Sequence, residues 1–117
     1  MRNLFNFLLS EKIIVLISIL FVLSFKANSQ HNPIGFLDHV DPHGGNGWAY
    51  DEDAGTAPIH VHVYIDGRLY ADVIANESRP DLVSAGVTPN PEHGFSFTIS
   101  GFDTSYAHEV IVYAIMP

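Results

Sequence analysis

The sequence predicts an all-β fold, a small antiparallel β-sandwich, from three observations. Short stretches in which apolar and polar residues alternate recur along residues 30–117, as in the I-H-V-H-V-Y-I run of residues 59–65. Gly, Pro and Asp residues separate these stretches about every ten residues, and none carries a helical apolar stripe longer than one turn. Chains with many short strands and such turns fold as two packed antiparallel sheets.

The first 29 residues predict export of the protein. Residues 13–25 form an uncharged apolar run, which as a helix would span about 20 Å and fall short of the ~30 Å membrane core. Small residues follow at Ala27 and Ser29, the two positions that a signal peptidase recognises. We therefore expect residues 1–29 to be a signal peptide cleaved after Ser29, leaving a secreted or periplasmic protein without stable membrane insertion. An uncleaved membrane anchor is the alternative.

The composition of residues 30–117 excludes several classes of partner. These residues include two basic and twelve acidic side chains, a formal net charge of −10, and no cysteine. Nucleic acid and anionic membranes are excluded because both require clustered Lys and Arg. Without disulfides, a domain of this size depends on its apolar core. We expect a short lead-in at residues 30–34 and one β-sandwich domain at residues 35–117.

The clearest pattern is a hairpin around Asp66-Gly67, a dipeptide typical of tight turns. In the strand before it, alternate residues predict one buried face and one exposed face. The buried face holds Ile59, Val61, Val63 and Ile65, and the exposed face holds His60, His62 and Tyr64. The strand after the turn, residues 69–73, alternates in the same way.

The register of this hairpin follows from keeping the apolar residues of both strands on one face. A two-residue loop mixes core and solvent positions on each face. A three-residue loop, residues 65–67, instead sets His62 opposite Tyr70 and His60 opposite Asp72. We expect the three-residue loop, which places Tyr70 on the same exposed face as the histidines.

The remaining elements have shorter patterns. Further strands are expected at residues 34–37, 48–50, 94–99 and 108–116. Residues 39–47 predict a loop because they are rich in turn-forming residues. One helical turn is expected at Pro80, since proline is tolerated at a helix start, and the adjacent Arg79 is expected to anchor this crossing segment to a carboxylate. A lone tryptophan in a β-sandwich, here Trp48, is most often a core residue.

Several motifs occur together in the order G-W-A-Y-D-E-D-A-G-T-A-P-I, V-H-V-Y-I-D-G, S-R-P-D, H-G-F and V-Y-A. From about Gly35 to Ala114 the chain resembles a repeat of secreted bacterial proteins, with a W-A-x-D strand, a V-x-V-Y-x-D-G hairpin and a closing V-Y-A strand. The resemblance implies an immunoglobulin-like module that accompanies cell-wall or surface proteins and has no known catalytic residues. Members of this family usually continue beyond the V-Y-A strand, so two alternatives stay open: the last strand closes the domain, or the chain is truncated at its C-terminus.

The exposed face of the hairpin is the candidate binding site. Its residues are His60, His62, Tyr64 and Tyr70. Tyrosine rings stack on sugars, so this face predicts binding of a carbohydrate, or of a protein partner, at the cell surface. Two histidines two apart on a strand can also share a zinc ion if a third ligand joins them. A cross-strand pair of His60 with Asp72 is the alternative role.

Asp51 and Asp53 form a candidate cation site. They place carboxylate oxygens at alternate positions before Gly55-Thr56, as in part of a calcium loop. The bidentate Glu that completes such a loop at its twelfth position is absent. A solvated acidic turn is the alternative, so we expect no obligatory cofactor, with calcium as the possible ligand.

The motifs of several enzyme classes are missing from the sequence. It has no cysteine nucleophile, no G-x-S-x-G elbow, no phosphate-binding glycine loop and no H-E-x-x-H motif, which disfavours an enzyme. We expect a secreted, non-catalytic β-sandwich module that binds carbohydrate or a protein partner. One alternative is a ligand-free spacer domain detached from a larger surface protein. The other is a metal-dependent hydrolase, which requires His60 and His62 to converge with another histidine.

Overall fold

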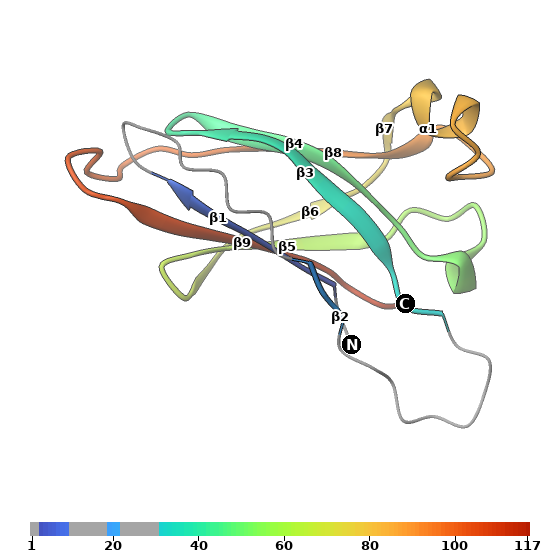
Figure 1. Ribbon diagram of the computed structural model, residues 1–117, viewed down its shortest axis with the longest axis horizontal. Coiled ribbons are helices and arrows are strands. Elements are labelled where there is room, and N and C mark those ends of the chain that lie inside the picture. Colours follow the sequence, from blue (N-terminus) through green and yellow to red (C-terminus); the bar gives the residue numbers. More distant parts are fainter. Residues whose placement is uncertain (1–2, 10–18, 22–30) are drawn as a thin grey trace.

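Two antiparallel β-sheets form the fold, which confirms the predicted small all-β sandwich (Figure 1). The computed structural model describes residues 3–9, 19–21 and 31–117. Sheet A consists of β1 (Asn3–Leu9), β2 (Ile19–Phe21), β5 (His60–Ile65), β6 (Arg68–Ile74) and β9 (His108–Ala114), in the order β2-β1-β9-β5-β6. Sheet B consists of β3 (Ile34–Asp41), β4 (Gly44–Tyr50), β7 (Glu77–Ser78) and β8 (Glu92–Thr98), in the order β3-β4-β8-β7.

Two strands of sheet A, β1 and β2, lie within the segment that we expect to be a signal peptide. In the full chain, β1 pairs antiparallel with β9 from Leu4 to Leu9. The predicted cleavage point after Ser29 lies outside the described residues, so export stays a prediction. In the described part of the chain, no helix is long and apolar enough to cross a membrane.

The predicted alternation of buried and exposed residues along β5 is confirmed. Val61 and Val63 are fully buried, whereas His60 is exposed and His62 is half-buried. β5 lies between β6 and β9, and β9 also has a neighbouring strand on each side. The core between the sheets is formed by residues of both layers, chiefly Leu37, Val40, Phe95, Phe97, Val110 and Val112. Burial of each such side chain stabilises the fold by roughly 1.5–3 kcal/mol.

The β5–β6 hairpin has a different register from the one predicted. Its loop contains two residues, Asp66 and Gly67, with φ of 51° and 80°, and Ile65 pairs directly with Arg68. A β-bulge at Tyr70 then brings the apolar residues of the two strands opposite one another. The prediction of a three-residue loop was therefore wrong, because a bulge inside the second strand restores the same alternation as a longer loop.

The connection between β3 and β4 is shorter than predicted. β3 continues to Asp41 and β4 begins at Gly44, so most of the loop predicted at residues 39–47 is paired strand. Trp48 lies in β4 between buried neighbours and is itself half-buried, outside the residues that form the core. The expectation that Trp48 fills the core was thus wrong.

The glycines inside β4 allow neighbouring atoms to approach the strand closely and do not form turns. A Cβ atom on Gly47 would lie 2.1 Å from the carbonyl oxygen of Phe36 in β3, and one on Gly45 would lie 2.6 Å from Cζ of Phe97. Both distances are far below van der Waals contact, so a side chain at either position would displace its neighbours. The rings of Phe95 and Phe97, from β8, occupy this space on the inner face.

The predicted helical turn is present as α1 (Pro80–Ser84). Arg79 precedes it and donates to both carboxylate oxygens of Asp81, at 2.8 and 2.7 Å. Its Nη1 donates to Oδ2 of Asp38, the bulged residue of β3, at 2.8 Å. The hydrogen bonds with Asp81 and Asp38 raise the pKa of Arg79 further. Arg79 therefore anchors α1 to sheet B through carboxylates, as predicted.

Candidate functional site

The outer face of β5 carries three of the four predicted binding residues, His60, His62 and Tyr64. Nδ1 of His60 lies 2.9 Å from Oδ1 of Asp72, and Nε2 of His62 lies 3.5 Å from Oδ2 of the same carboxylate. The hydrogen bond with His60 lowers the pKa of Asp72. The expected pairing of His60 with Asp72 is present, although the strand partner of Asp72 is His62.

The histidines do not converge in the part of the chain that the structure describes. No group of three or more His, Asp or Glu side chains is placed there to hold a metal ion. Four other imidazoles bond to separate partners instead: His31 to Asp53, His39 to Asp41, His93 to Asn90 and His108 to Asp66. The convergence that a zinc hydrolase requires of His60 and His62 is therefore not found among these residues.

Tyr70 lies apart from His60, His62 and Tyr64, which together form the histidine face of the sheet. Because it is the bulged residue of β6, it packs toward the β8–β9 connection, where its ring lies 5.5 Å from that of Phe102 at an angle of 59°. Its hydroxyl oxygen accepts a hydrogen bond from the Ser100 N–H at 3.1 Å. Tyr64 packs edge-on against Tyr113 instead, with ring centroids 5.2 Å apart. The four predicted residues thus occupy two separate places.

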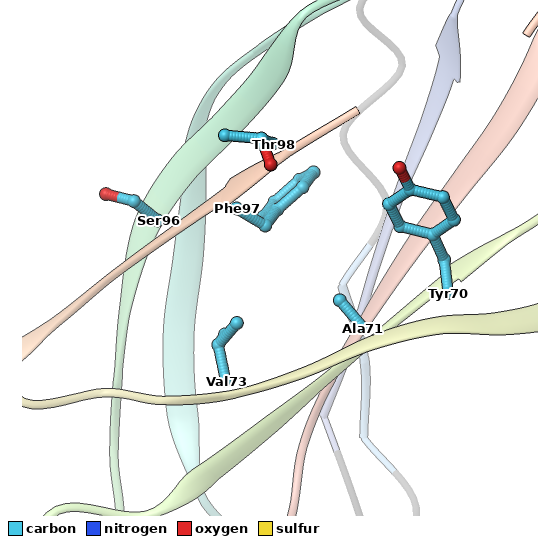
Figure 2. Close-up of a pocket in the computed structure, with 6 residues that line it drawn as sticks. All are labelled: Tyr70, Ala71, Val73, Ser96, Phe97 and Thr98. Carbon is cyan, nitrogen blue, oxygen red and sulfur yellow. The ribbon is translucent and has the colours of Figure 1, made fainter. Parts of the chain in front are cut away.

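A cleft lies between β6 and β8, and Tyr70 forms one end of it (Figure 2). Its volume of about 490 Å³ falls within the range of small-ligand sites. The cleft is lined by Tyr70, Ala71, Val73, Ser96, Phe97 and Thr98. Figure 2 shows these side chains around an open centre, with the Tyr70 ring across from Ser96 and Thr98. None of these six described side chains carries a charge.

The cleft combines an apolar floor with a hydroxyl-bearing rim. Phe97 is buried beneath it, while Ser96 and Thr98 are exposed on the neighbouring positions of β8. The Ser96 hydroxyl donates to Oε1 of Glu77 at 2.7 Å, which fixes its orientation. Tyr70 is 37% exposed, so part of its surface is available to a ligand. This arrangement suits an uncharged ligand that has both apolar faces and hydroxyl groups.

Sequence reasoning missed the β8 half of this cleft. The alternation of residues 94–99 already placed Ser96 and Thr98 on polar positions. Nothing in a single strand indicates which strand of the other sheet it will face, because that contact joins residues far apart in the chain. The bulge that turns Tyr70 toward β8 left no signal in the sequence either.

The two carboxylates of the predicted cation site have different surroundings. Asp51 is completely buried and caps η1 (Glu52–Ala54), where its Oδ1 accepts from the Asp53 N–H at 2.9 Å. Asp53 instead accepts from the backbone N–H of His31 at 2.7 Å, and its Oδ1 lies 3.0 Å from the His31 ring. Burial raises the pKa of Asp51, whereas the hydrogen bond with His31 lowers the pKa of Asp53. Calcium at this pair stays a prediction.

His93, at the start of β8, is buried with one nitrogen satisfied. Its Nε2 lies 2.7 Å from Oδ1 of Asn90, whose amide nitrogen donates to the Thr56 carbonyl, so Nε2 is the donor. Nδ1 of His93 and Oδ2 of Asp51 have no hydrogen-bond partner among the described protein atoms. A ring nitrogen without an acceptor carries no proton, and burial accordingly lowers the pKa of His93.

His108, at the start of β9, is buried with both nitrogens satisfied. Nδ1 lies 2.6 Å from Oδ2 of Asp66, and Nε2 is hydrogen-bonded to the carbonyl oxygen of Asp103. Both partners are acceptors, so both ring nitrogens must donate, which requires the imidazolium form. The bond with Asp66 is the main cause of a raised pKa for His108. The rings of Phe102 and Tyr106 pack against the imidazole at 5.2 and 4.5 Å.

Comparison of the chain with protein-family models, with curated proteins and with solved structures finds no match. The resemblance to a repeat of secreted bacterial surface proteins therefore stays a prediction.

Proposed function

We propose that the protein is an exported, non-catalytic β-sandwich module that binds a neutral carbohydrate in the cleft between β6 and β8. The observation that carries this proposal is the position of Tyr70. A bulge removes its ring from the outer face of sheet A, and the bond from Ser100 holds its hydroxyl at the end of the cleft. A fixed, partly exposed aromatic ring is a suitable platform for a sugar ring.

The chemistry of the lining supports a sugar over a charged ligand. Ala71, Val73 and Phe97 offer apolar surface to the C–H face of a sugar, and Thr98 offers a hydroxyl to its rim. Among the residues that the structure describes, no Asp, Glu, Lys, Arg or His lines the cleft. The lack of a carboxylate or imidazole in the lining also supports binding rather than catalysis, because general acid–base chemistry depends on such groups.

Glycan-array screening of the exported protein, together with a peptidoglycan pull-down, tests this function. A glycan identified there is then titrated by calorimetry against wild type and three variants. Tyr70→Ala is expected to weaken binding at least tenfold, about 1.4 kcal/mol. Tyr70→Phe keeps the ring and is expected to bind within about threefold of wild type.

Tyr64→Ala is the matched control, because it removes a tyrosine ring from the outer face of the same sheet. We expect it to leave glycan affinity unchanged. Loss of binding in Tyr64→Ala but not in Tyr70→Ala would show that the glycan binds at the histidine face and not in the cleft. A folded protein that binds no glycan would favour the spacer role.

A further inference from the structure

β9 has a neighbouring strand on each side in the full chain, β5 on one side and β1 on the other. β1 belongs to the segment that we expect to be removed on cleavage after Ser29. Removal of β1 leaves the seven residues of β9 as an edge of sheet A. β1 also lies beside β3 of sheet B, so its removal opens the flank of the core between the two layers.

The backbone groups of β9 that face β5 can be identified from the hydrogen bonds at its two ends. The carbonyl of Glu109 accepts from the Asp66 N–H at 2.9 Å, and the Ile115 N–H donates to the His60 carbonyl at 2.9 Å. The N–H and C=O of one residue in an antiparallel strand point to the same side, and the side alternates along the chain. The even-numbered residues of β9 therefore direct their backbone groups to the edge that β1 covers.

Two of these even-numbered residues have defined partners in β1. Val110 pairs with Phe7 and Val112 pairs with Phe5. Val110 and Val112 also direct their side chains into the core, where both are almost completely buried. A strand at this edge thus meets free backbone groups and apolar core residues at the same positions.

The other sheet edges of residues 31–117 carry features that discourage strand addition. β6 has a bulge and the charged residues Arg68 and Asp72, and β3 has a bulge at Asp38. β7 has only two residues. β9 has one carboxylate, Glu109, no proline, and no bulge in its pairing with β1 or β5. An edge of this kind is suited to accept another strand.

We propose that cleavage after Ser29 converts β9 into an acceptor for an extended segment of a partner protein. The segment runs antiparallel to β9, is uncharged over about seven residues, and has large apolar side chains at alternate positions. This chemistry is that of Asn3–Leu9, N-L-F-N-F-L-L, which is seated at this edge in the full chain. The proposal rests on the predicted cleavage and not on the carbohydrate site.

A partner segment is favoured over a second copy of the chain. Two β9 strands paired about Ile111 would place Val110 opposite Val112. In the full chain the residues at those positions are Phe7 and Phe5, which are much larger. A second copy would therefore bring valines to the positions that the register of the full chain assigns to phenylalanines.

The test begins with the protein produced by export of the full chain in a bacterial host. Mass spectrometry identifies its N-terminus, which we expect to be Gln30. A synthetic peptide of residues 2–10 with a solubilising lysine tail is then titrated into the ¹⁵N-labelled protein. We expect amide shifts and slowed hydrogen exchange at Val110, Val112 and Ala114, and none at the opposite edge, Arg68–Ile74. If the exported protein is unfolded alone, the peptide is expected to restore a folded spectrum.

A matched pair of peptides separates strand pairing from non-specific adhesion. N-methylation at Phe5 and Phe7 removes the N–H groups that face β9, and we expect it to weaken binding at least tenfold. N-methylation at Leu4 and Asn6 removes the N–H groups that face away, and we expect affinity to change less than threefold. The uncleaved chain, whose edge is already covered, is expected to bind at least tenfold more weakly than the processed protein.

Four results would overturn the proposal. They are retention of Asn3–Leu9 in the exported protein, equal affinity for the two methylated peptides, shifts that spare residues 108–114, and formation of a dimer through β9 that excludes the peptide. Glycan binding is independent of all four, so a failure here leaves the carbohydrate proposal standing.

Discussion

The two ends of the sandwich each bury one histidine, and the two imidazoles have opposite surroundings. At the turn end, defined by Asp66, Asp103 and His108, both ring nitrogens are bonded to acceptors. At the α1 end, defined by Asp51, Asn90 and His93, one ring nitrogen and one carboxylate oxygen have no partner among the described protein atoms. Figure 1 shows these ends at opposite extremes of the long axis, beside the β8–β9 connection and beside α1.

The difference shows that burial alone does not set the charge of a histidine. Both imidazoles are almost fully buried, yet hydrogen bonding raises the pKa of His108 while desolvation lowers that of His93. A carboxylate and a carbonyl compensate the charge at the turn end. At the α1 end, Asp51 is itself desolvated and its pKa is raised. The turn end therefore gains stability from ionised groups, whereas the α1 end loses stability when its groups ionise.

The largest test of this comparison is His108→Ala. The substitution removes two buried hydrogen bonds and the packing of two aromatic rings, so we expect the free energy of unfolding at pH 6 to fall by about 2–4 kcal/mol. Urea denaturation measures it. His60→Ala is the control: it removes an exposed His–Asp pair and is expected to cost less than about 0.5 kcal/mol. Equal effects of the two substitutions would refute a special role for the turn end.

The cost of His108→Ala is also expected to depend on pH. The folded pKa of His108 lies above 6.5, so its contribution is complete below about pH 6.5 and is lost as pH rises through the folded value. Desolvation opposes ionisation of Asp66, but the bonds with His108 and the Glu109 N–H lower its pKa overall, so its contribution is retained well below pH 5. We therefore expect a larger cost at pH 5.5 than at pH 9. A cost independent of pH would show that His108 is neutral.

Apart from the His60→Ala control, the smallest effect is expected at the α1 end, from Asp51→Asn. The folded pKa of Asp51 is raised, so the ionised carboxylate destabilises the folded state above its ordinary value of 3.8. The amide removes this charge and keeps an oxygen for the Asp53 N–H, so we expect stability at pH 7 to rise by about 1 kcal/mol. The gain should disappear below pH 3.8. Asp53→Asn removes the carboxylate charge that faces the His31 ring and is expected to have the opposite sign. A loss of stability in both variants would contradict this account.

The sequence was sufficient to predict which side of each strand faces the core. Alternation placed Val61 and Val63 inside and His60 outside, and the structure confirms this, because burial of apolar side chains decides orientation residue by residue. It could not fix the hairpin register. A bulge at Tyr70 and a three-residue loop satisfy the same alternation, and only contacts with β8 distinguish them.

The candidate site was predicted only in part for the same reason. His60, His62 and Tyr64 share a face because they belong to one strand. Tyr70 was assigned to them through the wrong register, and its actual neighbours in the cleft come from the other sheet. The buried histidines were equally hidden, since a sequence does not show that Asn90 or Asp103 will lie within hydrogen-bonding distance of an imidazole.

The glycines of β4 limit how this domain can vary. At Gly47 the obstructing atom is a backbone oxygen of β3, so a smaller residue in place of Phe95 would not create room for a methyl group. Gly45 is constrained in the same way by the His39 carbonyl, 2.7 Å from a would-be Cβ. A side-chain change elsewhere therefore cannot make room for a larger residue at either position. Both positions must stay glycine as long as the backbone of β3 keeps its present path.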